Sequence, residues 1–206
     1  MSMTLSVLVL AAGQGRRFGA EPKQLAPCMG APLLAHSLTL AEAMAPGRVM
    51  LILGAHAELI VRQMSRLQQL QYFVHPQWMN GLGASIAFGV QHLPADTDAV
   101  LILLADQIAL TQADVDGLRQ RFEQQRGESS LKNIVCAHYD GQVGVPAIFP
   151  RRYFSELAAL QGDKGAKKLL LTESIVSVSL PNAAIDIDTP EDLLNFTERK
   201  EPSCLN

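Results

Sequence analysis

The part of the sequence best suited to bind an anion is a loop that combines glycines with basic side chains. It follows an apolar segment at residues 5–10, whose pattern predicts a strand buried on both faces of a parallel sheet. The glycines and cations of this loop are Gly13, Gly15, Gly19, Arg16, Arg17 and Lys23. Glycines allow a close approach of the backbone, and exposed N–H groups beside fixed positive charge bind phosphate. We therefore expect a polyphosphate site here; the alternative is an ordinary flexible turn.

Two better-known phosphate-binding patterns do not match this loop. The Walker A pattern ends in Gly-Lys-Ser/Thr, whereas Gly19 is followed by Ala20. The dinucleotide fingerprint needs a third glycine where Phe18 stands. It also needs an acid after the second strand, but the apolar segment 48–53 runs into Gly-Ala-His at 54–56. The loop is therefore of a third kind.

A candidate metal ligand follows a second apolar segment, residues 99–104, which predicts another buried strand. Asp106 comes just after this segment. In a doubly wound sheet the carboxyl ends of the strands border one crevice, so we expect Asp106 to face the glycine loop. Mg²⁺ bridges phosphate oxygens and takes one or two protein carboxylates. Asp106 is thus a candidate Mg²⁺ ligand; the alternative is a helix cap or a solvated acid in a turn.

Two further aspartates, Asp186 and Asp188, stand two positions apart near the C-terminal end. In a strand they would share one face, and both would point toward a single metal or substrate. The other interpretation is that Asp188 or Thr189 caps a helix that starts at Pro190. Both interpretations stay open from the sequence.

A second glycine-rich segment, residues 80–85, contains Gly81, Gly83 and Ser85 and leads into a predicted helix. Its backbone amides are candidates for contacting a base edge or a ribose, and a plain turn is the alternative. The sequence shows no G-x-S-x-G elbow and no activated cysteine. Covalent hydrolysis is therefore disfavoured.

Composition predicts a soluble, cytoplasmic protein that binds neither nucleic acid nor membranes. With 206 residues, 48% of them hydrophobic, we expect one domain over residues 1–199 and a flexible tail at 200–206. The net charge of −3 and a pI near 5.9 argue against general nucleic-acid binding. No apolar segment reaches membrane length, and no signal sequence is apparent. Cys28, Cys136 and Cys204 have neither metal-ligand spacing nor an even number, which suits a reducing compartment.

Apolar segments alternate with helical patterns along most of the chain. Strands are predicted at 5–10, 48–53, 72–75, 99–104, 134–137, 145–149, 175–180 and 184–187. Helices are predicted at 32–44, 57–67, 85–92, 155–160 and 165–172, after Thr111, and from Pro190. Residues 125–133 and the tail are expected to be mobile. This alternation predicts an α/β, Rossmann-like fold of three α/β/α layers with a mostly parallel mixed sheet.

Several motifs together resemble those of the MobA-like nucleotidyltransferases, and within them the CTP:molybdopterin cytidylyltransferase branch. The resemblance covers about residues 5–195. The matching motifs are Leu10-Ala11-Ala12-Gly13, Gly15, Arg17-x-Gly19, Pro22-Lys23-Gln24-Leu25, Gly81-x-Gly83-x-Ser85, Leu104-Ala105-Asp106-Gln107, Gly162-Asp163-Lys164-Gly165-Ala166 and residues 186–192 (Asp-Ile-Asp-Thr-Pro-Glu-Asp). The first motif is specific for the superfamily, and its combination with Ala-Asp-Gln and Gly-Asp-Lys-Gly-Ala is more specific for the branch.

The resemblance implies a nucleotidyltransferase fold and the transfer of a nucleoside monophosphate to a phosphate monoester, with release of pyrophosphate. It implies that Lys23 neutralises phosphate and that Asp106 holds Mg²⁺. With the arguments from the residues, the predicted catalytic residues are Lys23, Arg17 and Asp106, and the predicted metal ligands are Asp106 and Asp188. The predicted nucleotide-binding residues are Leu10, Ala11, Ala12, Gly13, Gly15, Gly19, Lys23, Gly81, Gly83 and Ser85.

The resemblance also implies the two substrates. Ala12 stands where the GTP-using branch tends to have glycine, which favours CTP. The implied acceptor is molybdopterin, and a molybdoenzyme or its chaperone is the implied protein partner. The sequence departs from the branch at Val145, where histidine is usual, and at Ile108, where proline is usual.

Three alternatives to a molybdopterin cytidylyltransferase remain. A methylerythritol-phosphate cytidylyltransferase shares Pro-Lys-Gln, but its Asp-Ala-Ala-Arg-Pro segment is missing here. A binding protein that delivers the molybdenum cofactor without transferring a nucleotide, or an oxidoreductase on the same scaffold, would use the fold for other ends. Retention of both Asp106 and Lys23 favours catalysis.

Overall fold

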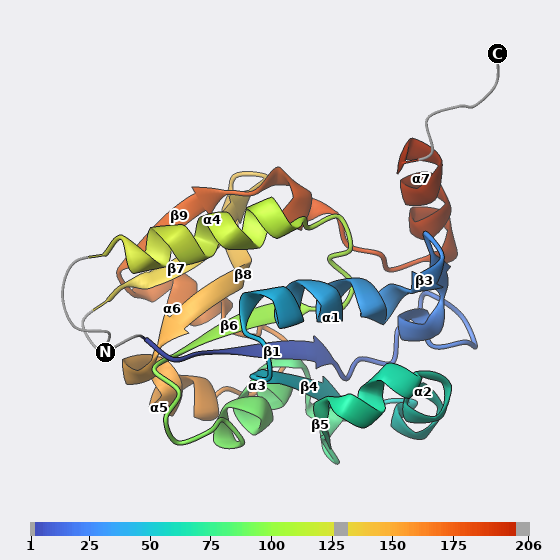
Figure 1. The fold of residues 1–206 in the computed structure, drawn as a ribbon, viewed down its shortest axis with the longest axis horizontal. Coiled ribbons are helices and arrows are strands. Elements are labelled where there is room, and N and C mark those ends of the chain that lie inside the picture. Colours follow the sequence, from blue (N-terminus) through green and yellow to red (C-terminus); the bar gives the residue numbers. More distant parts are fainter. Residues whose placement is uncertain (1–2, 126–131, 201–206) are drawn as a thin grey trace.

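The fold is an α/β sandwich built on one seven-stranded sheet (Figure 1). The computed structural model describes residues 3–125 and 132–200. The strand order is β5-β4-β1-β6-β8-β7-β9, and β8 runs antiparallel to both its neighbours, while the other pairs are parallel. The strands are β1 (Leu5–Ala11), β4 (Val49–Leu53), β5 (Gln71–Val74), β6 (Ala99–Leu104), β7 (Ile134–Tyr139), β8 (Gln142–Pro150) and β9 (Ile175–Ser179). The predicted mostly parallel mixed sheet is confirmed.

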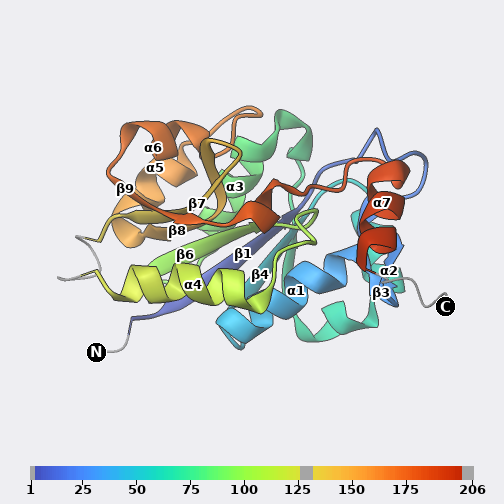
Figure 2. The ribbon, with the colours of Figure 1, turned by 90° about the horizontal axis from the view of Figure 1, so that it is seen from above.

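Helices cover both faces of the sheet and complete three layers (Figure 2). On one face lie α1 (Leu33–Met44), α2 (Ala57–Gln63) and α4 (Gln112–Glu123). On the other face lie α3 (Leu82–Gln91), α5 (Phe154–Ala158) and α6 (Lys167–Thr172). The last helix, α7 (Pro190–Lys200), stands beyond the end of β1 (Figure 1). The three-layer prediction is therefore confirmed.

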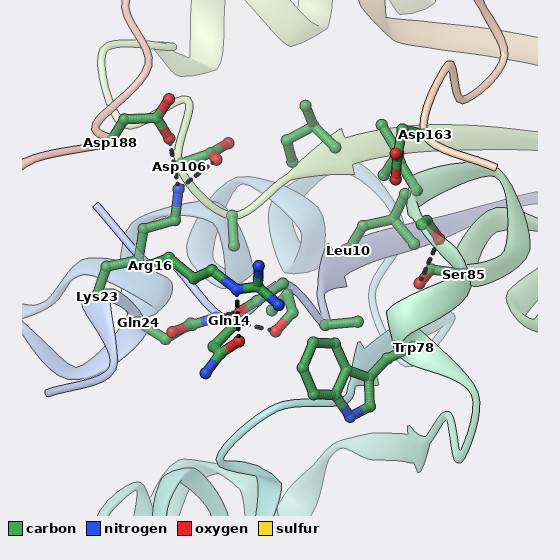
Figure 3. Close-up of a pocket in the computed structure, with 18 of the residues that line it drawn as sticks. Leu10, Gln14, Arg16, Lys23, Gln24, Trp78, Ser85, Asp106, Asp163 and Asp188 are labelled. Carbon is green, nitrogen blue, oxygen red and sulfur yellow. Dashed lines mark hydrogen bonds and ion pairs between the residues drawn. The ribbon is translucent and has the colours of Figure 1, made fainter. Parts of the chain in front are cut away.

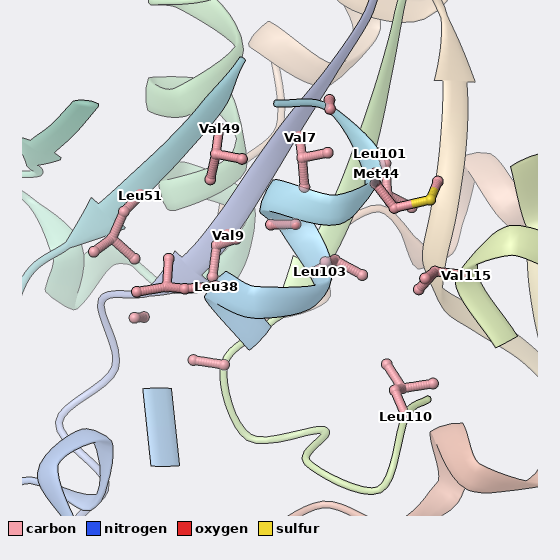
Figure 4. Close-up of a cluster of buried hydrophobic side chains, with 14 of the residues drawn as sticks. Val7, Val9, Leu38, Met44, Val49, Leu51, Leu101, Leu103, Leu110 and Val115 are labelled. Atoms are coloured by element: carbon pink, nitrogen blue, oxygen red, sulfur yellow. The ribbon is translucent and has the colours of Figure 1, made fainter. Parts of the chain in front are cut away.

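The core is divided in two by the sheet because successive side chains of a strand point to opposite faces. In β1, Val7 and Val9 contact the α1 side, whereas Leu8 and Leu10 contact the α3 side. Figure 4 shows the first of these clusters, with Leu38 of α1 over the strand residues. Burying a leucine side chain fully stabilises a fold by about 1.5–3 kcal/mol. The strands that carry the site are thus rigidly held.

The carboxyl ends of β1 and β6 lie side by side, which brings two distant loops together. Leu10 of β1 is paired with Leu104 of β6, so the chain continues from both at the same edge. After β1 come the glycine loop, a 3-10 turn (Lys23–Leu25) and the short hairpin β2 (Pro27–Cys28) and β3 (Ala31–Pro32). This edge is the predicted location of the site.

One segment predicted to be a strand has a different secondary structure. Residues 184–187 are not a strand: a 3-10 turn (Pro181–Ala184) is followed by irregular chain. Ile187 is buried with Cys28, Leu33 and Phe196, so its apolar character reflects packing against α7 and not a place in the sheet.

Other predicted elements differ in their limits. The helix predicted at 57–67 ends at Gln63 and is followed by a 3-10 turn (Ser65–Gln69). The helix predicted at 85–92 already begins at Leu82. Of the segments predicted to be mobile, residues 126–131 and 201–206 lie outside the described residues. Within the described ranges, no helix is both long and apolar enough to cross a lipid bilayer.

Candidate active site

A cleft of ≈530 Å³ opens at the carboxyl ends of β1 and β6 (Figure 3). Most of the residues predicted for the site line it: Leu10, Ala11, Ala12, Gly13, Gly15, Lys23, Gly81, Ser85, Asp106 and Asp188. Three predicted residues, Arg17, Gly19 and Gly83, are not part of the lining. The structure therefore brings the glycine loop, the acid after β6 and the C-terminal aspartate to one place.

The glycine loop keeps its backbone amides free. Gln24, which is buried, donates from Nε2 to the carbonyl oxygens of Ala11 and Gly13, each at 3.0 Å, and so occupies these two acceptors. In the described part of the chain, the amides of residues 13–17 donate to no protein acceptor. Gly15 (φ +63°) and Gly19 (φ +116°) adopt a positive φ, whereas Gly13 does not. Free amides in a turn form an anion-binding concavity.

The centre of charge is Lys23, whose side chain is only 11% exposed. Its Nζ donates to Asp106 Oδ2 at 2.7 Å, to the carbonyl oxygen of Ile187 at 3.0 Å and to Asp188 Oδ1 at 3.1 Å. Burial alone would lower the pKa of Lys23, but the charges of and hydrogen bonds to Asp106 and Asp188 outweigh it and raise the pKa. Lys23 is therefore a cation in this state.

Asp106 offers one carboxylate oxygen for a further ligand. Its Oδ1 is buried and has no hydrogen-bond partner among the described residues, whereas Oδ2 binds Lys23. Unpaired buried oxygens of this kind are unfavourable unless something binds them. Asp106 and Asp188 supply two carboxylates, the number that Mg²⁺ typically takes from a protein. The donors present therefore fit a divalent cation, with the condition that Lys23 Nζ leaves the space between them.

Asp188 reaches the cleft because a different residue caps α7. Thr189 and Asp192 cap the helix: Asp192 N donates to Thr189 Oγ1 at 3.1 Å, and Thr189 N donates to Asp192 Oδ2 at 2.8 Å. The side chain of Asp188 is left to pair with Lys23 and, at 3.5 Å, with Arg17. Of the two caps considered from the sequence, Thr189 is confirmed and Asp188 is wrong.

Asp186 does not point into the same cavity as Asp188, because the segment is not a strand. Asp186 lines a separate cavity of ≈350 Å³ together with Asp192 and Arg199. The residue is exposed, yet surrounding protein desolvates the carboxyl group, and this, with the charges of Asp106 and Asp188, raises the pKa of Asp186 to about 6. The two aspartates therefore line different cavities.

The second glycine segment forms the opposite wall of the cleft by close packing. Gly81 (φ +98°) precedes α3, and Gly83 lies inside the helix and not in a loop. The amide of Gly83 donates to the carbonyl oxygen of Gly162 at 2.7 Å, and a Cβ at Gly83 would lie 2.8 Å from the carbonyl oxygen of Gln161. These glycines hold the segment that carries Asp163 against the cleft.

Trp78 and Met79 also line the cleft, although no sequence pattern indicated them. Trp78 stands on the far side of the cleft from Lys23 (Figure 3), where its ring offers an aromatic face. Gly54 makes room for it, since a Cβ there would lie 2.5 Å from Trp78 Cβ. The one available signal was that Trp78 is the only tryptophan in the chain and closely precedes Gly81.

Comparisons with known proteins agree with this arrangement. Residues 7–177 match the model of the MobA-like NTP transferase domain. The bifunctional protein GlmU of Legionella pneumophila is 28% identical over 167 residues, which cover 81% of this chain and 35% of that protein. The chain thus spans about a third of the length of the curated relatives it matches.

Solved structures extend the likeness to the whole fold. The crystal structure of Rv0371c from Mycobacterium tuberculosis H37Rv has a TM-score of 0.81 and 27% identity, covering 96% of this chain and 100% of that one. The same protein in complex with manganese has a TM-score of 0.77 and 25% identity, covering 95% and 99%. With a family model that spans most of its length, this chain belongs to the family of MobA-like NTP transferase domains.

Proposed function

We propose that this protein is a nucleotidyltransferase that moves CMP from CTP to a phosphate monoester, most specifically molybdopterin, and releases pyrophosphate. The observation that carries the proposal is the shared cleft of the free loop amides and the Lys23–Asp106–Asp188 cluster. Amides suit a triphosphate, and paired carboxylates suit the divalent cation that accompanies it.

The reaction asks for little acid–base catalysis. The acceptor phosphate has a second pKa near 6, so at pH 7 it is already largely ionised and needs no general base. One of its oxygens forms a bond to the α-phosphorus of the nucleotide, and the bond from that phosphorus to the bridging oxygen of pyrophosphate breaks. The electron pair leaves with pyrophosphate, whose charge grows in the transition state.

The main barrier is repulsion between two anions. Two like unit charges 4 Å apart repel by about 4 kcal/mol at an effective dielectric constant of 20. In the proposal, the amides of residues 13–17 hold the triphosphate, and Arg17 and Lys23 offset its charge. Mg²⁺ held by Asp106 and Asp188 would neutralise phosphate oxygens in the same place. The manganese in the structure of the M. tuberculosis protein supports a divalent cation for this kind of fold.

The nucleotide is proposed to be CTP, on two grounds. The Ala11-Ala12 pair in the loop follows the pattern of CTP-using relatives. The base would stack on the face of Trp78, a sequence-tolerant contact that positions the ring while hydrogen bonds from the loop select it.

The acceptor is proposed to enter beside the cleft, over β8. A small cavity of ≈140 Å³ adjoins the cleft, since Leu82 and Leu104 line both, and Lys164 and Lys167 add positive charge to it. Val145, which stands where the resembled cytidylyltransferase branch usually has histidine, lines this cavity. The carbonyl oxygen of Val145 still accepts a hydrogen bond from Gln107 Nε2 at 3.0 Å, a contact that does not depend on the side chain.

We place the reaction in the cytoplasm, with a molybdoenzyme or its chaperone as the receiver of the product. Cys28 and Cys136 are free thiols, both buried, which suits a reducing compartment.

A pyrophosphate-release assay tests the proposal. CTP, GTP and ATP are each offered with and without Mg²⁺, and with molybdopterin or methylerythritol phosphate as the acceptor. The expected result is release from CTP that requires both Mg²⁺ and molybdopterin. Release with methylerythritol phosphate alone would change the acceptor, and release from GTP alone would change the nucleotide. Absence of pyrophosphate in every combination would overturn the transferase proposal in favour of a binding protein.

A further inference from the structure

Lys23 uses its whole hydrogen-bonding capacity inside the protein. An ammonium group has three N–H donors and no acceptor. The partners of Nζ are also three: Asp106 Oδ2 at 2.7 Å, the carbonyl oxygen of Ile187 at 3.0 Å and Asp188 Oδ1 at 3.1 Å. In this state no N–H of Lys23 is left for a phosphate oxygen.

The three acceptors of Lys23 are oxygens, the type of ligand that Mg²⁺ prefers. Two of them belong to Asp106 and Asp188, the carboxylates that fit a divalent cation. Protein oxygens contact Mg²⁺ at about 2.0–2.1 Å, so an ammonium nitrogen and a metal ion cannot occupy the space between the same two carboxylates. Their positive charges would also repel strongly at such a distance. At the position between Asp106 Oδ2 and Asp188 Oδ1, occupation by the Lys23 ammonium group and occupation by a metal are therefore mutually exclusive.

We propose that Lys23 is an exchangeable internal counter-ion. Without nucleotide, its ammonium group occupies the metal position and neutralises Asp106 and Asp188. When a metal–triphosphate complex enters, the metal replaces the ammonium group at the carboxylates, and Lys23 turns to the phosphates. This inference rests on the proposed function for the identity of the incoming complex. It predicts that metal alone binds weakly and that nucleotide and metal bind cooperatively. The metal releases Lys23 for the phosphates, and the phosphates stabilise Lys23 away from the carboxylates that bind the metal.

The side chain of Lys23 already lies beside the glycine loop. A Cβ at Gly15 would lie 3.3 Å from Lys23 Cγ and 3.5 Å from Cδ, so the lysine stem runs directly along the bare backbone of Gly15. Both residues line the cleft. In Figure 3 the ammonium group points to the two aspartates, on the side of the cleft away from Trp78. The proposed exchange requires Nζ to turn from the two aspartates toward the loop, which lines the same cleft.

The test is Mn²⁺ binding to the nucleotide-free protein, measured by calorimetry. Removing the ammonium group in Lys23→Met should raise the affinity for Mn²⁺ by at least about tenfold, because two carboxylates then lack a counter-ion. The matched control is Lys132→Met, which removes another buried lysine, one that lies 4.7 Å from the centre of the Phe122 ring. That control should bind Mn²⁺ as the unaltered chain does. Adding Asp106→Asn to Lys23→Met should abolish the gain.

Equal or weaker Mn²⁺ binding by folded Lys23→Met would overturn the exchange. If the variant fails to fold because Asp106 and Asp188 repel, Mn²⁺ should restore its cooperative melting transition, and failure to restore it would also refute the proposal. The two proposals fail separately. A gain in Mn²⁺ affinity without pyrophosphate release by the unaltered protein leaves the exchange intact and rejects the transferase. Pyrophosphate release by the unaltered protein, without a gain in Mn²⁺ affinity in Lys23→Met, supports the transferase and rejects the exchange.

Discussion

The parallel strands carry ion pairs at both of their ends, and the two groups differ in burial and in connection. At the amino ends, Arg48 before β4 pairs with Asp96 before β6 at 2.8 Å, and the side chain of Asp96 is 66% exposed. At the carboxyl ends, Lys23 is almost buried and joins two aspartates at once. The amino-end pair ties one loop to another, whereas the carboxyl-end cluster lines a cleft.

We interpret the exposed Arg48–Asp96 pair as a contribution to stability and the Lys23–Asp106–Asp188 cluster as part of the proposed ligand site. An exposed pair contributes about 0.2–1 kcal/mol, and its loss is tolerated. A buried cluster loses solvation and gains little net stability, and here it also leaves Asp106 Oδ1 without a partner in the described chain. Arg48 Nε of the amino-end pair is also buried without a hydrogen-bond partner in the described chain, so the unpaired atom alone does not distinguish the two groups. What distinguishes Asp106 is its place in the cleft, where the proposed function puts a divalent cation.

The largest expected difference is between Asp106→Ala and Asp96→Ala. Asp106 is proposed to hold the metal, so Asp106→Ala should lower kcat for CMP transfer by about 10²–10³, the usual loss when a group that stabilises the transition state is removed. Asp96→Ala should leave kcat within about twofold, because its pair is exposed and lies at the other end of the strands. Steady-state pyrophosphate release on purified, folded variants measures both. Equal losses of kcat in the two variants would contradict the proposal that only the carboxyl-end cluster takes part in catalysis.

A second contrast uses two glycines. Gly81→Ala should lower the free energy of unfolding by about 1–3 kcal/mol, because Gly81 has a φ of +98° and a Cβ there would overlap Gly162 and Asp163. It should also raise KM for the nucleotide, since this contact shapes the cleft wall. Gly117→Ala, inside α4 with open space around it, should instead stabilise the fold by about 0.5–1 kcal/mol. Urea denaturation and nucleotide titrations decide, and a neutral Gly81→Ala would contradict the packing described.

Two arginines give a smaller contrast. Arg17 is 79% exposed and lies 3.5 Å from Asp188, so Arg17→Ala should lower kcat/KM by about five- to tenfold at low salt and by less at high salt, since salt screens exposed charges. Arg48→Ala should leave kcat/KM unchanged and lower the free energy of unfolding by less than about 1 kcal/mol. Assays at two ionic strengths measure the effects. A salt-independent loss in Arg17→Ala would show that Arg17 acts from a buried position.

The smallest effect is on pH dependence, where aspartates of the two ends should act in opposite directions. Desolvation and neighbouring carboxylates raise the pKa of Asp186 to about 6, whereas the hydrogen bond from Arg48 lowers the pKa of Asp96 below its ordinary value of 3.8. The folded state then holds the Asp186 proton more tightly than the unfolded state. Its ionisation therefore disfavours folding increasingly as pH rises from about 4 to 6, and constantly above that.

Asp186→Asn should consequently be more stable than the unaltered chain at pH 7, with the difference shrinking as pH falls toward 4. Asp96→Asn should be less stable at pH 7, because ionised Asp96 favours folding, and this difference should vanish only when pH falls through the lowered pKa of Asp96. Urea denaturation at several pH values, without metal, measures both series. Parallel pH profiles would contradict the assignment.

The sequence predicted the buried frame of the fold well, for a physical reason. The strands β1 and β6 are buried on both faces and therefore read as continuous apolar runs. The start of α4 was predicted correctly after Thr111, because Thr111 and Asp114 form a capping box, a local pattern. Local chemistry decided these elements, so local sequence sufficed to find them.

What the sequence did not predict depends on contacts between distant residues. Lys23 binds Asp106 across 83 positions and Asp188 across 165, and no spacing rule gives such a triad. Residues 184–187 were predicted to be a strand because an apolar residue such as Ile187 is expected both in a buried strand and in a loop packed against a helix. Ile187 is in fact buried against α7. Trp78 belongs to no periodic pattern, and only the space at Gly54 explains its position.

The central claim is that the nucleotide binds in the cleft at the carboxyl ends of β1 and β6. A crystal structure with CTP and Mn²⁺, in which anomalous scattering locates the metal, tests this most directly. We expect the triphosphate on the amides of residues 13–17, the metal peak next to Asp106 and Asp188, and Lys23 Nζ within hydrogen-bond distance of a phosphate oxygen. Nucleotide bound in another cavity, with the glycine loop empty and Lys23 still on both aspartates, would contradict the account.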